Sequence, residues 1–186
     1  MFRFIVIILI LNFYRPAFSS TKEMIISKME LTNILSFNFT QTIDDKNENG
    51  NCVIKYPKKI FCKYSGSDKK IIVSNGRSLV IKNKHKGSYY LYPLKKTPLE
   101  LLLDKKYLIS KINTLTPIDI DNKILAFKIF NNDNSNKINI FFDKKSFNLI
   151  GWQTEDVYQN LIITFISSIK VNEIIDEDIF NLPSRD

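Results

Sequence analysis

Residues 36–43 have the sequence Ser-Phe-Asn-Phe-Thr-Gln-Thr-Ile, and this stretch decides the class of fold. Its bulky residues Phe37, Phe39 and Ile43 alternate with small polar residues. Successive side chains of a β-strand point to opposite faces, so the alternation places the bulky residues on one face. The stretch therefore predicts a half-buried strand.

The same period of two extends outward over most of the chain. Polar turns separate the apolar segments, among them residues 44–50 and the hairpin signal Asn75-Gly76. A long antiparallel sheet of this kind has to curl or close, because open edges expose unpaired backbone groups. The pattern predicts a mainly β (α+β) protein. Further strands are expected over residues 52–56, 60–64, 70–74, 78–83, 88–92, 124–130, 137–143, 147–153 and 158–167.

Two segments depart from this period and predict short helices. Residues 21–35 place Ile25 and Met29 on one face, with Thr21 as the N-cap. Residues 97–103, Thr-Pro-Leu-Glu-Leu-Leu-Leu, put Thr at the N-cap and Pro at the first helical position. The second helix is apolar enough to cover the mouth of a curled sheet.

The first nineteen residues predict a secretory signal peptide. Arg3 precedes an apolar run over residues 4–11, and Ala17-Phe18-Ser19 fits a cut before Ser20. The run is shorter than the roughly 20 residues that span a bilayer, and an uncleaved N-terminal anchor is the alternative. We expect residues 20–186 to form a single exported domain.

The sequence contains few candidates for catalytic residues, which argues against an enzyme. The chain has 27 Lys and Arg, 19 Asp and Glu and one His, for a formal net charge of +8. That histidine, His85, lies between two Lys in a predicted turn, whereas a hydrolytic triad needs an imidazole beside a nucleophile and an acid. The sequence has no metal-ligand spacing and no Gly-rich phosphate loop. We expect no catalytic residue, no metal and no cofactor.

The excess of cations does not predict a nucleic-acid partner. A surface that binds single-stranded nucleic acid interleaves Lys or Arg with exposed aromatic residues. Here the Lys pairs lie in or beside predicted turns, and the aromatic residues lie on the apolar faces of strands. Export argues further against nucleic acid.

Two cysteines flank the predicted turn at Pro57. Cys52 and Cys62 are equidistant from it and share parity with the apolar residues of their strands. In an oxidising compartment such cross-strand neighbours favour a disulfide, whereas two free buried thiols are the alternative. A curled sheet with one apolar face could hold acyl chains, since each buried methylene contributes about 0.8 kcal/mol. A dry aromatic core is the alternative to such a cavity.

The order of the motifs resembles the LolA family of periplasmic outer-membrane lipoprotein carriers. The resemblance covers nearly all of residues 20–186, and it lies in the order and spacing of the motifs more than in any one of them. The family opens with a helix that leads to an F-x-Q element and closes with an F-x-x-P tail. The matching segments are Phe39-Thr40-Gln41, Gly50 through Lys55-Tyr56-Pro57, residues 60–64, residues 72–76, residues 93–99, Asn172 and Phe180-Asn181-Leu182-Pro183.

The resemblance implies an unclosed antiparallel β-barrel, or strongly curved sheet, with short helices forming a lid over a hydrophobic cavity. It implies a periplasmic chaperone, a monomer that receives the acyl chains of lipoproteins from an inner-membrane ABC exporter. An outer-membrane acceptor, where present, would take them over. Another lipid cargo, and a protein-binding adaptor or sensor on the same scaffold, are the alternatives.

Two positions depart from the family pattern. The family has Arg immediately before the turn Pro, where it hydrogen-bonds to the lid, and this chain has Tyr56. Cys62 stands where a bulky aromatic residue is common, which agrees with the disulfide hypothesis and would widen the cavity. The phenol of Tyr56 can still hydrogen-bond to the lid but carries no charge, so lid closure is expected to be weaker, or arranged differently.

Strand parity predicts which side chains line the cavity. The lid residues are Leu99, Leu102 and Leu103. The expected inner-face residues are Phe37, Phe39, Ile54, Tyr56, Ile60, Tyr64, Leu79, Ile81, Leu125, Phe127, Ile129, Ile138, Ile140, Phe142, Ile150, Trp152, Leu161, Ile163 and Phe165.

Overall fold

A computed structural model describes residues 20–66, 69–131, 136–155 and 159–185. Across them it holds one antiparallel sheet of eleven strands and three short α-helices, which confirms the mainly β prediction. None of the helices in these ranges is long and apolar enough to cross a membrane. The strands are β1 (Ile34–Ile43), β2 (Lys46–Lys55), β3 (Lys59–Ser65), β4 (Lys70–Asn75), β5 (Ser78–Asn83), β6 (Ser88–Pro93), β7 (Ile118–Ile120), β8 (Ile124–Phe130), β9 (Lys137–Asp143), β10 (Leu149–Glu155) and β11 (Leu161–Val171). The helices are α1 (Thr21–Leu31), α2 (Leu99–Leu103) and α3 (Lys105–Thr114), with 3-10 turns η1 (Leu94–Lys96) and η2 (Glu177–Phe180).

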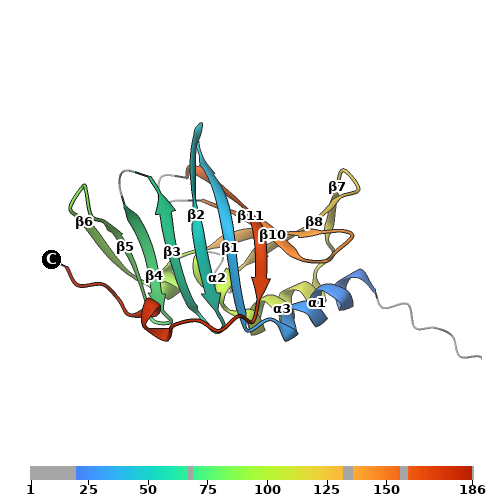
Figure 1. Cartoon of the computed structure of the whole chain (residues 1–186). Coiled ribbons are helices and arrows are strands. Elements are labelled where there is room, and N and C mark those ends of the chain that lie inside the picture. Colours follow the sequence, from blue (N-terminus) through green and yellow to red (C-terminus); the bar gives the residue numbers. More distant parts are fainter. Residues whose placement is uncertain (1–19, 67–68, 132–135, 156–158, 186) are drawn as a thin grey trace, which may run out of the picture.

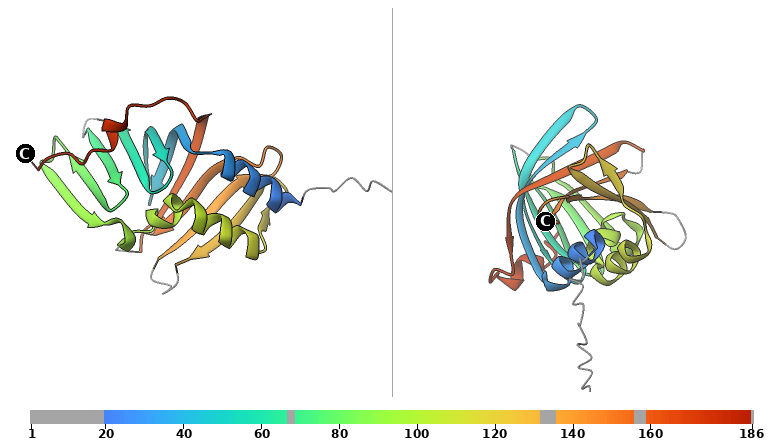
Figure 2. Two further views of the ribbon diagram at one scale, coloured as in Figure 1. Left: turned by 90° about the horizontal axis from the view of Figure 1, so that it is seen from below. Right: turned by 90° about the vertical axis from the view of Figure 1, so that its right-hand side faces the viewer.

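The sheet curls without closing. The strand order is β6-β5-β4-β3-β2-β1-β11-β10-β9-β8-β7, so the strand pair β1–β11 joins two meanders and β6 and β7 are left as edges (Figure 1). Figure 2 shows the sheet wrapped around its concave side, where α1 and α3 lie next to each other. The predicted signal peptide, residues 1–19, lies outside the described residues.

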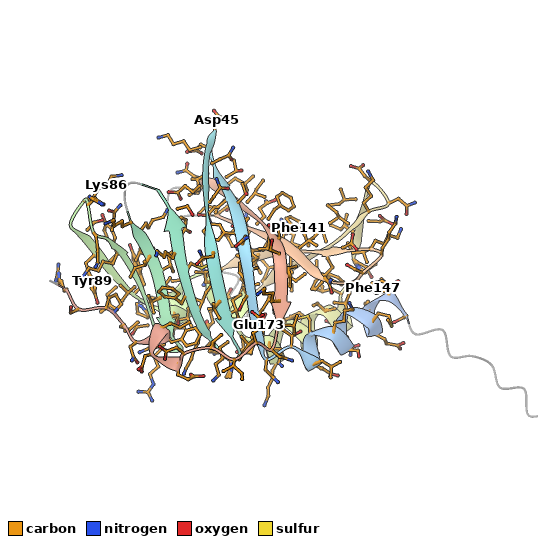
Figure 3. The ribbon with its side chains drawn as sticks, in the orientation of Figure 1. Asp45, Lys86, Tyr89, Phe141, Phe147 and Glu173 are labelled. Atoms are coloured by element: carbon orange, nitrogen blue, oxygen red, sulfur yellow. A yellow bond between two sulfur atoms is a disulfide. The ribbon has the colours of Figure 1, made fainter. Side chains whose placement is uncertain are left out.

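The hairpin between β1 and β2 is longer than the sequence analysis predicts. Residues 44–50 are not all turn, because β2 already begins at Lys46. Polar side chains bridge the two strands along this extension, where Thr40 Oγ1 donates a hydrogen bond to Asn49 Oδ1 at 2.8 Å. Figure 3 places Asp45 at the tip of this projecting hairpin. A polar composition therefore marks a solvent-exposed strand here and not a loop.

Helix α1 is shorter than the expected helix over residues 21–35. Ser20 is its N-cap in place of Thr21, and Glu23 completes a capping box. The helix stops at Leu31 because the following residues join the sheet. The backbone N–H groups of Asn33 and Ile34 both donate to Asn172 Oδ1, at 2.8 and 3.1 Å.

Helix α3 is absent from the sequence predictions. Asp104 caps it by accepting a hydrogen bond from the backbone N–H of Tyr107 at 3.1 Å. Its residues Leu108 and Ile112, one turn apart, are both buried. Together α2 and α3 connect the edge strand β6 to the opposite edge strand β7.

The helices pack against part of the concave face. The core beneath them includes Leu102, Leu103 and Leu108, and burying a side chain of this size stabilises the fold by about 1.5–3 kcal/mol. This core also contains many of the residues predicted to face inward. They are Phe37, Ile54, Leu125, Phe127, Ile129, Ile138, Ile140 and Phe142.

Candidate ligand-binding cavity

Another part of the concave face lines an open cavity of about 770 Å³. This volume lies in the range of small-molecule sites. The walls come from β1 to β6 and from β9 to β11, and the segment around Pro98 borders the cavity. The apolar part of the lining consists of Phe39, Ile43, Cys52, Ile60, Cys62, Tyr64, Ile72, Leu79, Ile81, Tyr92, Pro98, Leu99, Trp152 and Ile162.

The predicted cavity residues divide into separate groups. Phe39, Ile60, Tyr64, Leu79, Ile81, Trp152 and the lid residue Leu99 line this cavity. Tyr56, Ile140 and Phe142 line a second cavity of only about 50 Å³ beside α1 and α3. The structure thus places Phe37, Ile54, Phe127 and Ile129 in the core and not at the cavity wall.

The predicted face of β11 is wrong. Phe165 is 48% exposed and Leu161 is also exposed, whereas Ile162 and Thr164 line the cavity and the predicted Ile163 does not. Both faces of this strand carry bulky residues, so hydrophobicity cannot show which face is inward. The outer side of the sheet has its own aromatic contact, in which the rings of Phe165 and Phe141 stack with centroids 6.0 Å apart.

A register shift explains why Ile150 is not part of the core cluster. The pairing of β10 with β9 is irregular between Leu149 and Gly151, which changes the parity of the strand at this point. Leu149 packs against the core in its place. Beyond the irregularity, Trp152 and Thr154 line the cavity.

A glycine allows two aromatic rings to pack closely in the cavity wall. The rings of Phe39 and Tyr64 meet edge to face with centroids 4.9 Å apart. Phe39 lies directly over Gly50 of the neighbouring strand, where a Cβ atom would meet the ring at 2.7 Å and the Lys63 carbonyl at 2.3 Å. The ring can occupy this place only because residue 50 is a glycine.

A short chain of polar groups crosses the apolar wall. The Tyr64 hydroxyl donates to Gln41 Oε1 at 3.0 Å, and Gln41 Nε2 donates to Thr164 Oγ1 at 3.0 Å. Burial raises the pKa of the Tyr64 phenol, and the negative charge of Glu48 raises it further. Tyr64 is therefore a neutral hydrogen-bond donor. The network joins β3, β1 and β11 around the cavity.

Cys52 and Cys62 form a disulfide in the cavity wall. They are directly opposed on β2 and β3, with Cα atoms 4.1 Å apart, and both are buried. The bridge cross-links the two strands next to the turn that contacts the lid.

Lys58 connects that turn to the lid. Its ammonium group lies 3.1 Å from Glu100 Oε1 and 3.1 Å from Asp104 Oδ2, at the two ends of α2. Its backbone N–H donates to the Leu103 carbonyl at 2.9 Å. Burial alone would lower the pKa of Lys58, but the hydrogen bonds to and the charges of Asp104 and Glu100 outweigh it, and the pKa is raised.

Tyr56, at the position of the family's Arg, does not line the large cavity. Burial raises the pKa of its phenol, and the Lys105 ammonium lies 5.6 Å from its ring centroid. The cation that contacts the lid is therefore on the other side of Pro57. Sequence reasoning missed Lys58 because its carboxylate partners lie more than forty residues away.

The lid residues have two different roles. Leu102 and Leu103 are fully buried in the core, whereas Leu99 borders the cavity beside Pro98. Cationic and polar side chains, among them Lys70, Lys96 and Lys137, complete the boundary of the cavity. Within the described ranges no cluster of three or more His, Cys, Asp or Glu could hold a metal ion, and His85 is exposed.

A curved, unclosed sheet around a mainly apolar cavity, bordered by a short helix, defines the class: a mainly β protein with a cavity of small-molecule size. Its family follows from the sequence. The chain belongs to the LolA family, because the family model for "Outer membrane lipoprotein carrier protein LolA" matches residues 30–183. Proteins of this family are carriers and not enzymes.

Comparisons with single proteins give more distant likenesses. A search of curated protein sequences finds no match. Among solved structures, the chain is similar to a LolA superfamily protein from Nitrosomonas europaea, with 10% identity, 85% of this chain and 96% of that chain covered, and a TM-score of 0.46. An uncharacterised conserved protein from Thermus thermophilus shares 8% identity over 88% and 94% of the chains, with a TM-score of 0.49. A chain of the Pseudomonas aeruginosa MucA/MucB complex shares 9% identity over 89% and 62%, with a TM-score of 0.45.

Proposed function

We propose that this protein is a periplasmic chaperone that binds the acyl chains of lipoproteins in its cavity and carries them from the inner to the outer membrane. Residues 1–19 would direct its export, and residues 20–186 would form the carrier domain. An inner-membrane ABC exporter would supply the cargo, and an outer-membrane acceptor would receive it. The single observation that carries the proposal is the apolar cavity of about 770 Å³ in a chain of the LolA family.

The chemistry of the wall suits acyl chains. Aliphatic and aromatic side chains make up most of it, and transfer of each methylene from water into such a site is worth about 0.8 kcal/mol. The polar groups of Gln41, Tyr64 and Thr164 bond to one another and so do not require a polar ligand. The wall therefore supports a ligand held by its hydrocarbon part.

The position of Leu99 supports a lid that gates this site. Leu99 is at the cavity border, while Leu102 and Leu103 anchor the same helix in the core. Outward movement of the first turn of α2 would enlarge the opening while the core end of the helix stayed in place. Lys58 would limit this movement through Glu100.

A charge inserted in the cavity tests the proposal. Ile81 is half-buried and lines the cavity, so Ile81→Glu should abolish co-purification of triacylated lipoprotein from a periplasmic extract. Ile71, also half-buried, is on the opposite face of the neighbouring strand, and Ile71→Glu is the matched control. Equal lipoprotein capture by both variants would contradict the proposal.

The same preparations distinguish the cargo. Mass spectrometry of an organic extract of the purified protein should show the acylated cysteine of lipoproteins. Free phospholipid or glycolipid alone would instead identify a carrier of another lipid. With either cargo, the Ile81→Glu variant should lose its ligand.

A further inference from the structure

The positive charge of the chain is concentrated in one segment. Residues 69–99 contain eight Lys and Arg and no Asp or Glu. The rest of residues 20–186 contains 17 cations and 19 acids, and so is slightly negative. The excess of cations is therefore a local property of β4, β5, β6 and η1.

Four of these cations flank the open edge of the sheet. Strand β6 pairs with β5 alone and ends the sheet on that side (Figure 1). Lys84 and Lys86 lie in the turn before β6, and Lys95 and Lys96 follow it in η1, all four exposed. Figure 3 shows Lys86 at the tip of this hairpin. Cations thus stand at both ends of the edge strand.

The edge strand itself presents bulky side chains to solvent. Tyr90, Leu91 and Tyr92 are 52%, 57% and 40% exposed, and the two tyrosine rings stack with centroids 6.5 Å apart. We call these three residues with Lys84, Lys86, Lys95 and Lys96 the β6 edge. Lysines within an edge strand protect it from pairing with other chains, but β6 has none within its own span.

The opposite edge has a different character. Strand β7 is three residues long and contains Asp119, which forms an ion pair with Lys144. Strand β7 also exposes Ile118 and Ile120, but it has no aromatic residue. Of the two edge strands that the structure describes, β6 is thus the one that combines exposed aromatic residues with a local excess of positive charge. The pattern calls for a partner that is negative and also accepts aromatic and aliphatic side chains.

A bilayer with anionic phospholipids has both properties. Tyr side chains prefer the interface between headgroups and hydrocarbon, and a Lys near an anionic surface is attracted to it. Tyr92 and Lys96 belong to the β6 edge and also line the cavity. We propose that the β6 edge docks the protein on an anionic phospholipid bilayer, with the border of the cavity next to the membrane.

Docking would give cargo a short path between membrane and cavity, and only this consequence rests on the proposed function. The docking itself is measured without cargo, by sedimentation with vesicles. Residues 20–186 should bind vesicles of phosphatidylcholine mixed with phosphatidylglycerol, and should not bind phosphatidylcholine alone. Added salt should weaken the binding, because it screens exposed charges.

Two matched quadruple variants locate the surface. The first variant combines Lys84→Gln, Lys86→Gln, Lys95→Gln and Lys96→Gln. It should weaken vesicle binding by at least about tenfold. The control variant combines Lys106→Gln, Lys123→Gln, Lys128→Gln and Lys145→Gln. It removes the same charge from exposed positions elsewhere, so it should change vesicle binding by less than about twofold. Circular dichroism should show that both variants remain folded.

A separate variant tests the aromatic contribution. Tyr90→Ser combined with Leu91→Ser should weaken binding at high salt, where the charge contribution is small, and Leu31→Ser, at an exposed position in α1, should not. Equal losses in the two quadruple variants would overturn the proposal, and so would a wild-type protein that ignores anionic vesicles. Capture of a protein partner through β6 without vesicle binding would also overturn it. None of these results would change the outcome for lipoprotein binding by Ile81→Glu.

Discussion

Lys58 Nζ lies 3.1 Å from Glu100 Oε1, and this ion pair joins the turn between β2 and β3 to the lid helix α2. Asp104 adds a second carboxylate at the same distance, at the other end of the helix. The family pattern has an arginine on the preceding side of Pro57, where this chain has Tyr56. Here a cation on the following side of the proline contacts the lid.

Removing this cation should loosen α2 more than the whole protein. Lys58→Met should lower the free energy of unfolding by only about 1 kcal/mol or less, because the ion pairs are partly exposed. Amide hydrogen exchange in residues 99–103 should become several-fold faster. Lys59→Met is the control, since Lys59 pairs with Glu177 of η2. Unchanged exchange in α2 would show that Lys58 does not hold the lid.

The buried phenol of Tyr64 should make the free energy of unfolding fall at alkaline pH. Its folded-state pKa is raised above the ordinary value of 10.0, mainly by burial. Because the neutral form is favoured in the folded state, this contribution to stability is complete below pH 10.0 and is lost as the pH rises through the folded pKa. Absorbance titration of phenolate should therefore lose one late-ionising group in Tyr64→Phe.

Gly50→Ala should destabilise the protein by about 1–3 kcal/mol, since the added methyl group overlaps the Phe39 ring and the Lys63 carbonyl. Urea unfolding measures the loss. At Gly66 a Cβ atom meets nothing within 4 Å, so Gly66→Ala should leave the free energy of unfolding unchanged or slightly higher. A tolerated Gly50→Ala would mean that Phe39 can leave its place in the cavity wall.

The Cys52–Cys62 disulfide should contribute about 2–3 kcal/mol, as a bridge between residues ten apart in sequence. Unfolding of the wild type should shift to lower urea in the presence of dithiothreitol. The double variant Cys52→Ala, Cys62→Ala should show the same lowered stability and no response to the reductant. A response in the double variant would assign the effect of the reductant to something other than this bridge.

Local patterns predict the fold well where one strand face is clearly polar. Phe37 and Phe39 lie inward as expected. The polar residues Ser36, Asn38 and Thr40, which alternate with them, mark the outer face of the strand. In β11 the apolar residues occur on both faces, so strand parity predicts the wrong inner face. The composition of residues 46–49 predicts a turn, because these residues are polar on both faces, yet they pair with β1 as a strand.

The cavity itself needed the tertiary structure. Parity alone cannot divide an inner face into core and cavity, and the division depends on where α1, α2 and α3 lie. Helix α3 is absent from the sequence predictions, although Asp104 is a capping residue and Leu108 and Ile112 have helical spacing. The tether through Lys58 depends on residues more than forty positions apart, and no local pattern carries that information.

Site-specific photo-crosslinking tests the central claim most directly. A photoreactive amino acid at position 81 faces the cavity, and the same residue at position 71 is on the opposite face of the sheet. In cells that express each variant, position 81 should crosslink to the acylated N-terminal cysteine of lipoproteins, identified by mass spectrometry, and position 71 should not. Equal crosslinking at both positions, or crosslinks from position 81 to protein segments without acyl chains, would contradict the carrier function.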